Sequence, residues 1–449
     1  MADTYSRVPG DLRGTGFRPR VFAVRVFLPF AAGYFLSYVF RTVDGTIANA
    51  LVRDLGLSAG TLGTLTSLYF LTFAALQLPL GALIDRYGPR RVNAVLLAVA
   101  GAGAVLFGLS REVAVLMLAR ALIGLGTAGA LMTGLKALAL RMPKERLAAI
   151  NGIFVMFGGM GAAAATAPAW LAMRLVGWHA LFLGLGAATA LVALAVYAVV
   201  PEHGAAGTAA AARGSCARAL LEGVRRVYGD AAFWRLAPLS ACVIGTAFAV
   251  QSLWAARWMV DVSRFGSTSV MAYLGLMGGA LMLGAVLIGT IASALRRRGV
   301  APMTIFGCAA AVFLLVQATL ILRVAAPAAV VWAGFAVFAG MTVLSYAILA
   351  EMFPQELLGR ANGARNVMHL GMAFAIQAAM GGIVDVWAPG ADGHYPVAAY
   401  QAAFLLPFVL GSGALAWFVY ARPAARGVEA AAPLPAAALF AAEEAVDYC

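Results

Sequence analysis

Charged residues are scarce in this 449-residue chain. Asp, Glu, Lys and Arg together make up 11% of it, whereas hydrophobic residues make up 63%. Soluble proteins carry about a quarter charged residues, so a soluble multidomain protein is excluded. The four cysteines are scattered without disulfide or metal-ligand spacing. No P-loop, nucleophile elbow or acid-rich diphosphate motif occurs either. Nothing in the sequence therefore indicates an enzyme, an ATP-driven pump or a cofactor.

What the chain does contain is a series of long apolar runs. A helix of about 20 apolar residues is long enough to cross a bilayer core of about 30 Å. Runs of this length, bounded by charge, Pro or Gly, predict an all-α membrane protein with twelve transmembrane helices. The candidate spans lie near 27–50, 61–83, 92–110, 113–140, 148–172, 177–200, 235–258, 268–294, 301–322, 327–350, 364–387 and 398–421.

Polar segments divide these spans into two sets of six. Residues 27–200 are expected to form an N-terminal six-helix bundle, and residues 235–421 a C-terminal one. A segment rich in Ala, Gly and Arg, residues 201–234, is expected to link them. Residues 1–26 are polar and basic, without the short apolar core of a cleaved signal peptide. Residues 422–449 form an Ala-rich tail that we expect to be disordered.

The basic residues indicate the orientation. Most of the 32 Lys and Arg residues lie in the head, the tail, the linker and the loops on the same side as these. The opposite loops hold only Arg53, Arg111, Arg174, Arg264 and Arg323. The positive-inside rule then places both termini in the cytoplasm, in a multi-pass protein of the cytoplasmic (inner) membrane. The net charge of +13 is explained by anionic lipid and requires no nucleic acid.

Two cytoplasmic loops are similar to each other in sequence. "MPKERLAAING" follows span four and "FPQELLGRANG" follows span ten. Their matching positions, at a constant offset, are Pro143, Glu145, Asn151 and Gly152 against Pro354, Glu356, Asn362 and Gly363. "GALIDRYGPRR" has a weaker echo in "GTIASALRRRG" at nearly the same offset. These matches predict two pseudo-symmetric bundles, related by an axis along the membrane normal.

The same motifs carry a family resemblance. "GALIDRYGPRR" resembles the loop signature of the major facilitator superfamily (MFS) between its second and third spans, and "RALIGLGTA" resembles that superfamily's fourth-span pattern. The resemblance covers about residues 20–422 and implies the MFS fold of a secondary transporter. It also implies that Asp85, Arg86 and Arg90 form an interdomain latch in the outward-open state.

Other residues of that loop have simple physical roles. Gly81 is expected to let neighbouring helices approach closely. Gly88 and Pro89 would reverse the chain, and Arg90 and Arg91 would hold the loop at the lipid headgroups. The alternative to the latch is a turn that only fixes topology. Ser293 replaces the acid in the second half, so only one latch is expected.

Span one contains a polar stripe. Tyr34, Ser37, Tyr38, Arg41 and Asp44 recur at intervals of three and four, so they share one helix face. A charge near mid-span must face protein or water. Two interpretations of Arg41 remain open: it docks an anionic solute beside Tyr34 and Tyr38, or it pairs with Asp44 as a structural ion pair.

Resemblances within the superfamily refine this interpretation. An Arg at this point of span one resembles that of the organic phosphate antiporters, which pair it with an Arg in span seven. The span-seven Arg257 lies too near the outer end for a similar clamp. Arg120 resembles the span-four Arg linked to proton coupling, and its alternative role is a buried hydrogen-bond donor to span one. Asp44 is the only acid well inside a span, so Asp44 and Arg120 are the predicted coupling residues.

In the second half, Gln251 and Gln377 lie nearest mid-depth and are the predicted substrate-binding residues there. His369 lies closer to the inner face, and a lone histidine is more often a packing residue. Arg365 and Asn366 begin span eleven and are expected to line the inner vestibule. Lys136, at the end of span four, can extend to the headgroups.

These features predict a secondary transporter, presumed monomeric, that moves a small organic anion or zwitterion by rocker-switch alternating access. Protons are the expected coupling ion, and uptake the expected direction. A drug/proton antiporter is an alternative, although span five lacks the G-P-x-x-G-G pattern of such exporters. A non-transporting membrane receptor on the same scaffold is another.

Overall fold

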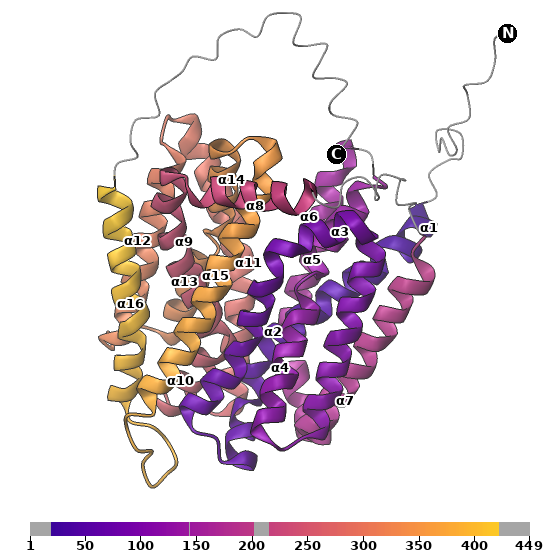
Figure 1. Cartoon of the computed structure of the whole chain (residues 1–449). Coiled ribbons are helices and arrows are strands. Elements are labelled where there is room, and N and C mark those ends of the chain that lie inside the picture. Colours follow the sequence, from indigo (N-terminus) through magenta and orange to yellow (C-terminus); the bar gives the residue numbers. More distant parts are fainter. Residues whose placement is uncertain (1–18, 143, 202–214, 422–449) are drawn as a thin grey trace, which may run out of the picture.

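The computed structural model describes residues 19–142, 144–201 and 215–421. All regular secondary structure within these ranges is helical. Two lobes stand side by side, with the N-terminal helices in indigo to magenta and the C-terminal helices in rose to yellow (Figure 1). We call them the N-lobe (residues 27–200) and the C-lobe (residues 235–421).

The N-lobe is preceded by the single turn α1 (Pro19–Phe22) and a π-helical turn, η1 (Ala23–Phe27). Its helices are α2 (Leu28–Leu55), α3 (Ala59–Leu109), α4 (Val113–Thr127), α5 (Ala130–Ala139), α6 (Lys144–Ala164) and α7 (Ala167–Val199).

The C-lobe follows helix α8 (Ser215–Tyr228). Its helices are α9 (Ala231–Ala249), η2 (Val250–Trp254, π-helical), α10 (Ala255–Asp261), α11 (Ser267–Arg297), α12 (Pro302–Ile321), α13 (Ala328–Ala339), α14 (Thr342–Met352), α15 (Gln355–Val384) and α16 (Val397–Tyr420).

Two of the helices, α3 and α7, are each interrupted at a glycine with non-helical backbone angles. Gly88 divides α3 with φ 80° and ψ 153°, and Gly177 divides α7 with φ 78° and ψ 165°. Only glycine adopts such angles without strain, so the chain reversal expected at Gly88 is confirmed. Within the described residues, ten helical stretches are apolar and long enough to cross a membrane. One of them, the 51-residue α3, holds two spans, and α6 contains a shorter apolar stretch, Ala149–Ala164, so the arrangement is compatible with the predicted twelve.

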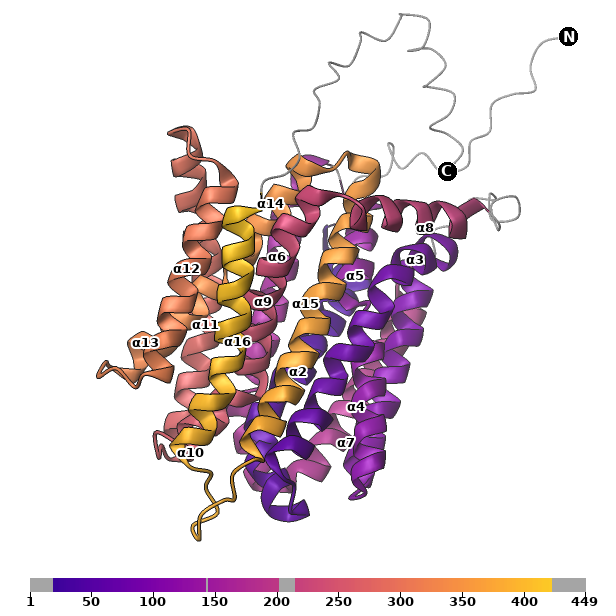
Figure 2. The same ribbon diagram turned by 60° about the vertical axis from the view of Figure 1, so that its left-hand side comes forward.

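The segment expected to be a plain linker contains a helix. Helix α8 lies across one end of the bundle, which we call the linker side (Figure 2). The Tyr228 hydroxyl donates to the Ala364 carbonyl of α15 at 3.2 Å, which ties α8 to the C-lobe. Helix α9 begins at Ala231, slightly before the predicted boundary. Residues 1–18, 202–214 and the predicted disordered tail from 422 onward lie outside the described residues.

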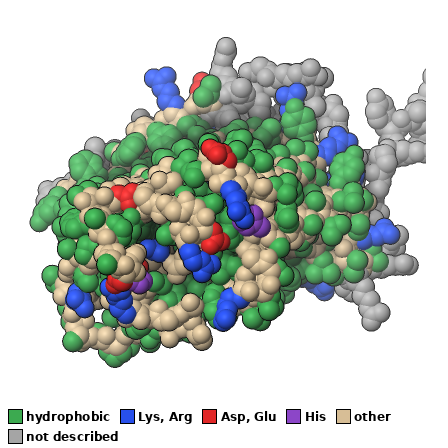
Figure 3. Space-filling view, turned by 90° about the horizontal axis from the view of Figure 1, so that it is seen from below, with side chains coloured by type: hydrophobic (Ala, Val, Ile, Leu, Met, Phe, Trp, Pro, Cys, Tyr) green, Lys and Arg blue, Asp and Glu red, His purple; other side chains and the backbone are tan. Residues whose placement is uncertain are grey.

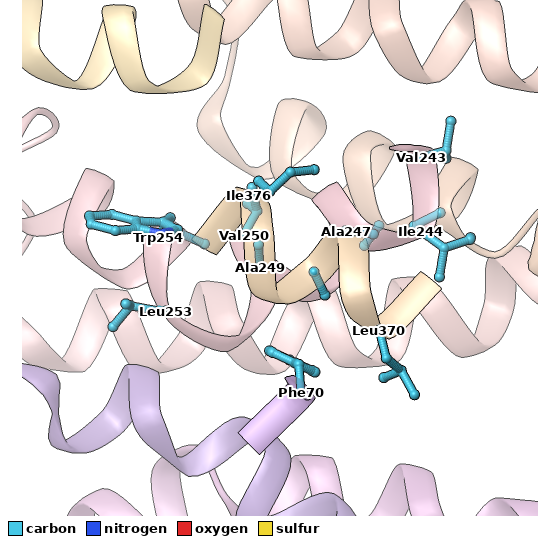
Figure 4. Close-up of a cluster of buried hydrophobic side chains, with 14 of the residues drawn as sticks. Phe70, Val243, Ile244, Ala247, Ala249, Val250, Leu253, Trp254, Leu370 and Ile376 are labelled. Atoms are coloured by element: carbon cyan, nitrogen blue, oxygen red, sulfur yellow. The ribbon is translucent and has the colours of Figure 1, made fainter. Parts of the chain in front are cut away.

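The two lobes share a continuous apolar core. Side chains of α9, η2 and α15 meet Phe70 of α3 in one buried cluster (Figure 4). Phe70 stacks on Phe248 across the lobe boundary, with ring centroids 6.1 Å apart and planes 1° apart. Elsewhere large apolar side chains face outward, such as Leu175 and Leu191, at 75% and 67% exposure. Outward-facing apolar groups suit contact with lipid.

The end of the molecule opposite α8 carries the loop between α15 and α16, and we call it the far side (Figure 1). Seen from there, acidic and basic side chains form small groups separated by apolar surface (Figure 3). The first described helix and the last described residues of α16 both lie on the linker side (Figure 1). This agrees with an even number of crossings between them.

Candidate functional site

Arg41 lies on α2 at the boundary between the lobes. Its guanidinium carbon is 4.6 Å from the ring centroid of Tyr38, 5.2 Å from that of Phe73 and 5.1 Å from that of Phe248. Phe248 belongs to the C-lobe, so rings of both lobes surround this cation. The side chain makes no ion pair with any described residue, and its Nε atom is buried without a hydrogen-bond partner. Arg41 is therefore a cation that retains binding capacity.

Asp44 pairs with Arg120 and not with Arg41. A guanidinium nitrogen of Arg120 binds the Asp44 carboxylate, and both side chains are almost fully buried, at 0% and 2% exposure. Arg120 also donates to the Phe40 carbonyl at 3.3 Å. The expected hydrogen bonds from Arg120 to span one are thus present. The alternative in which Asp44 neutralises Arg41 is not what the structure shows.

Tyr69 of α3 lies between Arg41 and the Asp44–Arg120 pair. Its ring centroid is 5.5 Å from the Arg120 guanidinium carbon, and its hydroxyl group interacts electrostatically with Arg41. That hydroxyl also donates to the Ser37 carbonyl at 3.2 Å. Sequence analysis missed Tyr69, Phe73 and Phe248, because an aromatic residue within an apolar run has no distinguishing spacing.

The two predicted tyrosines extend from Arg41 toward the linker side. Tyr34 and Tyr38 meet edge to face, with centroids 5.2 Å apart. Tyr34 is buried and stacks on Phe154 of α6, again at 5.2 Å, whereas Tyr38 is partly exposed. Tyr34 also interacts electrostatically with Tyr346 of the C-lobe. Arg41 thus lies at the lobe interface, whereas Ser37 and Asp44 bind α4 inside the N-lobe.

The two predicted glutamines differ in their surroundings. Gln251 is partly exposed and lies in the π-helical turn η2, a kind of turn found frequently at functional sites. Gln377 is fully buried. Its amide donates to Thr66 of the N-lobe at 2.5 Å and accepts from Ser252 of the C-lobe at 2.8 Å. In this conformation Gln377 joins the lobes, so both ends of its amide are occupied by protein.

The predicted latch residues lie on the linker side. Asp85 accepts from Lys136 of the same lobe at 3.2 Å, with the two side chains 66% and 48% exposed. Arg86 lies over Tyr87, and Arg90 lies over Tyr197, while Arg91 is exposed. The close helix approach expected at Gly81 is wrong for this conformation, since a Cβ there would meet no atom within 4 Å. In this conformation, no described residue packs closely against α3 at Gly81.

A second buried cation lies in the C-lobe. Arg365 of α15 is fully buried and donates to the Ser345 hydroxyl at 2.6 Å and to the Asn366 amide oxygen at 3.2 Å. Tyr346 covers it, with the ring centroid 3.5 Å from the guanidinium carbon. One turn farther along α15, His369 is hydrogen-bonded to Ser240 at 2.8 Å, which fits the expected packing role.

The far side is closed by hydrogen bonds between the lobes. Asp385, at the end of α15, accepts from the Ser58 hydroxyl at 2.6 Å and from the Gly60 amide at 2.8 Å. Both donors lie at the first turn of α3, where unpaired amides and the helix dipole favour a carboxylate. Tyr395 donates to the same carboxylate at 3.0 Å. Asp385 thus caps a helix of the opposite lobe.

Arg257 belongs to this far-side closure. It donates to Asn49 of the N-lobe at 2.7 Å and to Asp261 at 2.9 Å. Asp261 also binds His394 at 2.8 Å and the Tyr400 hydroxyl. A small pocket beside Arg257 is lined by far-side residues including Tyr395. Since Asp261 neutralises Arg257, the structure agrees that Arg257 is not a partner of Arg41 in an anion clamp.

Among the described residues, no three His, Cys, Asp or Glu side chains are grouped to hold a metal ion. The chemistry offered by the lobe interface is therefore that of cations, aromatic rings and hydroxyl groups. Such groups can interact with an anionic or aromatic solute.

Comparison with known proteins agrees with this fold. The family model described as Major Facilitator Superfamily matches residues 30–376. The chain is 32% identical over 155 residues to a probable sulfoacetate transporter, SauU, of Cupriavidus necator, covering 34% of this chain and 36% of the relative. It is 28% identical over 130 residues to the nitrate/nitrite transporter NrtP of a Picosynechococcus species, covering 29% and 24%. The matched stretches therefore span well under half the length of these relatives.

Among solved structures, a bacterial homologue of the human lysosomal transporter Spinster is similar over 90% of this chain and 97% of its own. The TM-score is 0.69 and the sequence identity is 19%. At this level of sequence identity, the similarity shows a shared arrangement of the helices only.

Proposed function

The chain belongs to the major facilitator superfamily, and we propose on that premise that it transports a small organic anion or zwitterion across the cytoplasmic membrane. The observation that carries this proposal is Arg41, a cation at the lobe boundary with no carboxylate partner among the described residues. An unpaired charge within a membrane costs several kcal/mol. Binding an anionic group would offset that cost, because it supplies the missing counter-charge.

Asp44 and Arg120 form the proposed coupling pair. A carboxylate held by a buried arginine can take up a proton only if the pair loosens, and a solute binding at Arg41 could influence this through Tyr69. Four side chains form a chain of interactions: Arg41 interacts electrostatically with Tyr69, Tyr69 lies over Arg120, and Arg120 binds Asp44. This arrangement supports proton-coupled transport. We further propose that the direction is uptake and that the transporting unit is a monomer.

Alternating access is proposed as the rocking of the N-lobe against the C-lobe. The far-side hydrogen bonds of Asp385 and Arg257 cross between the lobes, whereas Asp85 is bound within its own lobe. We assign this arrangement to an inward-facing state, with the linker side and both termini in the cytoplasm. In the outward-open state the latch of Asp85, Arg86 and Arg90 would form, and the far-side contacts would break.

The names of two relatives favour an anion. SauU is described as a probable sulfoacetate transporter, and NrtP as a nitrate/nitrite transporter. Sulfoacetate, nitrate and nitrite are all anions, as a solute bound by Arg41 would be. The rival candidate is a multidrug exporter, which is favoured by the three aromatic rings around Arg41. A receptor on the same scaffold would bind a solute without moving it.

Uptake into proteoliposomes separates these functions. We would screen the purified protein against carboxylates, sulfonates, amino acids and cationic drugs by thermal shift, then measure flux of the best ligand. Arg41→Gln should abolish anion uptake, whereas Arg111→Gln, an exposed arginine, should not change it. Normal uptake by a well-folded Arg41→Gln protein would remove Arg41 from the site. Drug efflux that survives the substitution would favour the exporter, and binding without flux a receptor.

A further inference from the structure

Arg365 has the features of a second anion-binding residue. This guanidinium is fully buried, and among the described residues it donates hydrogen bonds to the neutral groups of Ser345 and Asn366. No carboxylate interacts with it among the described residues, and its Nε atom is buried without a partner. A charge kept in the membrane region without a counter-charge is costly, so a purely structural role explains it poorly.

Arg365 lies between the level of Arg41 and the linker side. It lies on α15 near the linker side, eight residues before Ala373 and thus about 12 Å along the helix from it. Ala373 packs against Gly245 of α9, one turn from Phe248, which lies over Arg41. Arg365 is therefore displaced from the level of Arg41 toward the linker side.

A row of tyrosines connects the two cations. Arg41 contacts Tyr38, and Tyr38 contacts Tyr34. Across the lobe boundary, Tyr346 interacts electrostatically with Tyr34 and lies over Arg365. Tyr346 is 41% exposed although the arginine behind it is fully buried. The ring of Tyr346 thus covers Arg365 on its exposed side.

We propose that Arg365, with Ser345 and Asn366, forms a second anion-binding site between Arg41 and the linker side, uncovered when Tyr346 turns away. It would take a carboxylate, sulfonate or phosphate group, since the planar guanidinium fork matches these oxygens. A solute released from Arg41 would occupy this site before it leaves. The proposal rests on the proposed function, because it assumes that anions pass between the lobes.

The test measures anion binding by purified protein at constant ionic strength, with acetate, lactate, methanesulfonate and inorganic phosphate as probes. Thermal shift and calorimetry would compare wild type, Arg41→Gln, Arg365→Gln and the double variant. We expect the Arg41→Gln variant to bind anions more weakly than wild type. The double variant should bind them more weakly still, with a Kd at least about tenfold higher than that of Arg41→Gln. Arg360→Gln, a partly exposed position on the same helix, is the control and should resemble wild type.

Tyr346 supplies a gain-of-binding test that a structural role would not produce. In the Arg41→Gln background, Tyr346→Ala should tighten anion binding because the cover is removed, and Tyr346→Phe should leave it unchanged because the ring remains. If Arg41→Gln and the double variant bind anions equally, the second site does not exist. If Arg365→Gln alone removes binding, the second site stands and the proposed role of Arg41 fails. If wild type binds no probe, both proposals fail.

Discussion

Asp44 and Arg120 form a buried ion pair that joins α2 to α4 and leaves Arg41, one turn away on α2, without a carboxylate partner among the described residues. Two of these three charges form a neutral pair, and Arg41 is paired with no residue that the structure describes. The pair also holds the first and fourth spans together, since Arg120 binds the Phe40 carbonyl as well. The division of these charges decides which residue can receive an anion.

Breaking that pair should be costly. Asp44→Asn or Arg120→Gln leaves one buried charge unpaired, and such changes destabilise proteins by about 3–5 kcal/mol. We therefore expect a lower unfolding temperature for each single variant, measured by intrinsic fluorescence. The double variant should recover part of the loss, because no unpaired charge remains. Equal stability of Arg120→Gln and the exposed control Arg111→Gln would show that the pair contributes little.

The glycines of span four should be intolerant of larger side chains. A Cβ at Gly126 would overlap the backbone of α3 at Leu96 and Ala100, and overpacking typically costs about 1–3 kcal/mol. Gly126→Val should therefore lower the yield of monodisperse protein and its unfolding temperature. Gly278→Val is the matched control, because a Cβ there meets no atom within 4 Å. A similar effect of both substitutions would contradict the close packing.

Asp385 should stabilise closure of the far side. Asp385→Asn weakens the cap on α3 and, for an exposed carboxylate, should shift the balance toward the outward-open state by about 1 kcal/mol, or roughly fivefold. Labelling of a single cysteine at position 66 from the far side would report the shift, since Thr66 is buried between the lobes. Asp392→Asn, which loses a pair with Arg264 inside the C-lobe, should leave labelling unchanged.

The latch should affect rate more than affinity. Asp85→Asn is expected to slow transport several-fold while the Kd of the solute stays within about twofold. Lys136→Gln frees Asp85 from an exposed pair worth about 0–1 kcal/mol, so it should shift the balance toward the latched state by less than about tenfold. Flux and binding measured on the same preparations check both effects. Equal rates for wild type and Asp85→Asn would reduce this loop to a topological turn.

Much of the fold could be predicted because its signals are local. The length of each apolar run, the glycine and proline at positions 88 and 89, and the two similar loop sequences are properties of short stretches. The helix within the expected linker was missed because α8 carries polar and basic residues that resemble those of a flexible segment. Gly81 was misjudged because its small size alone does not show whether another helix packs against it.

The candidate site was predictable only in part. The stripe on span one identified Arg41, Asp44 and the tyrosines from helical spacing. The choice of partner for Asp44 was not predictable, because two arginines were within plausible reach. Phe248 and Tyr346 could not be connected with Arg41 and Arg365 either, since residues of different helices have no spacing in common.

The sequence alone determined that this protein is a helical membrane protein with two related halves, because burial in lipid imposes length, hydrophobicity and charge asymmetry on each segment separately. Only the tertiary structure decided which buried charges are neutral and which are free. Ion pairing depends on distances of a few ångströms between helices that are far apart in the chain. The packing of α2 against α4 thereby neutralised Asp44 and left Arg41 without a carboxylate in the part of the chain that the structure describes.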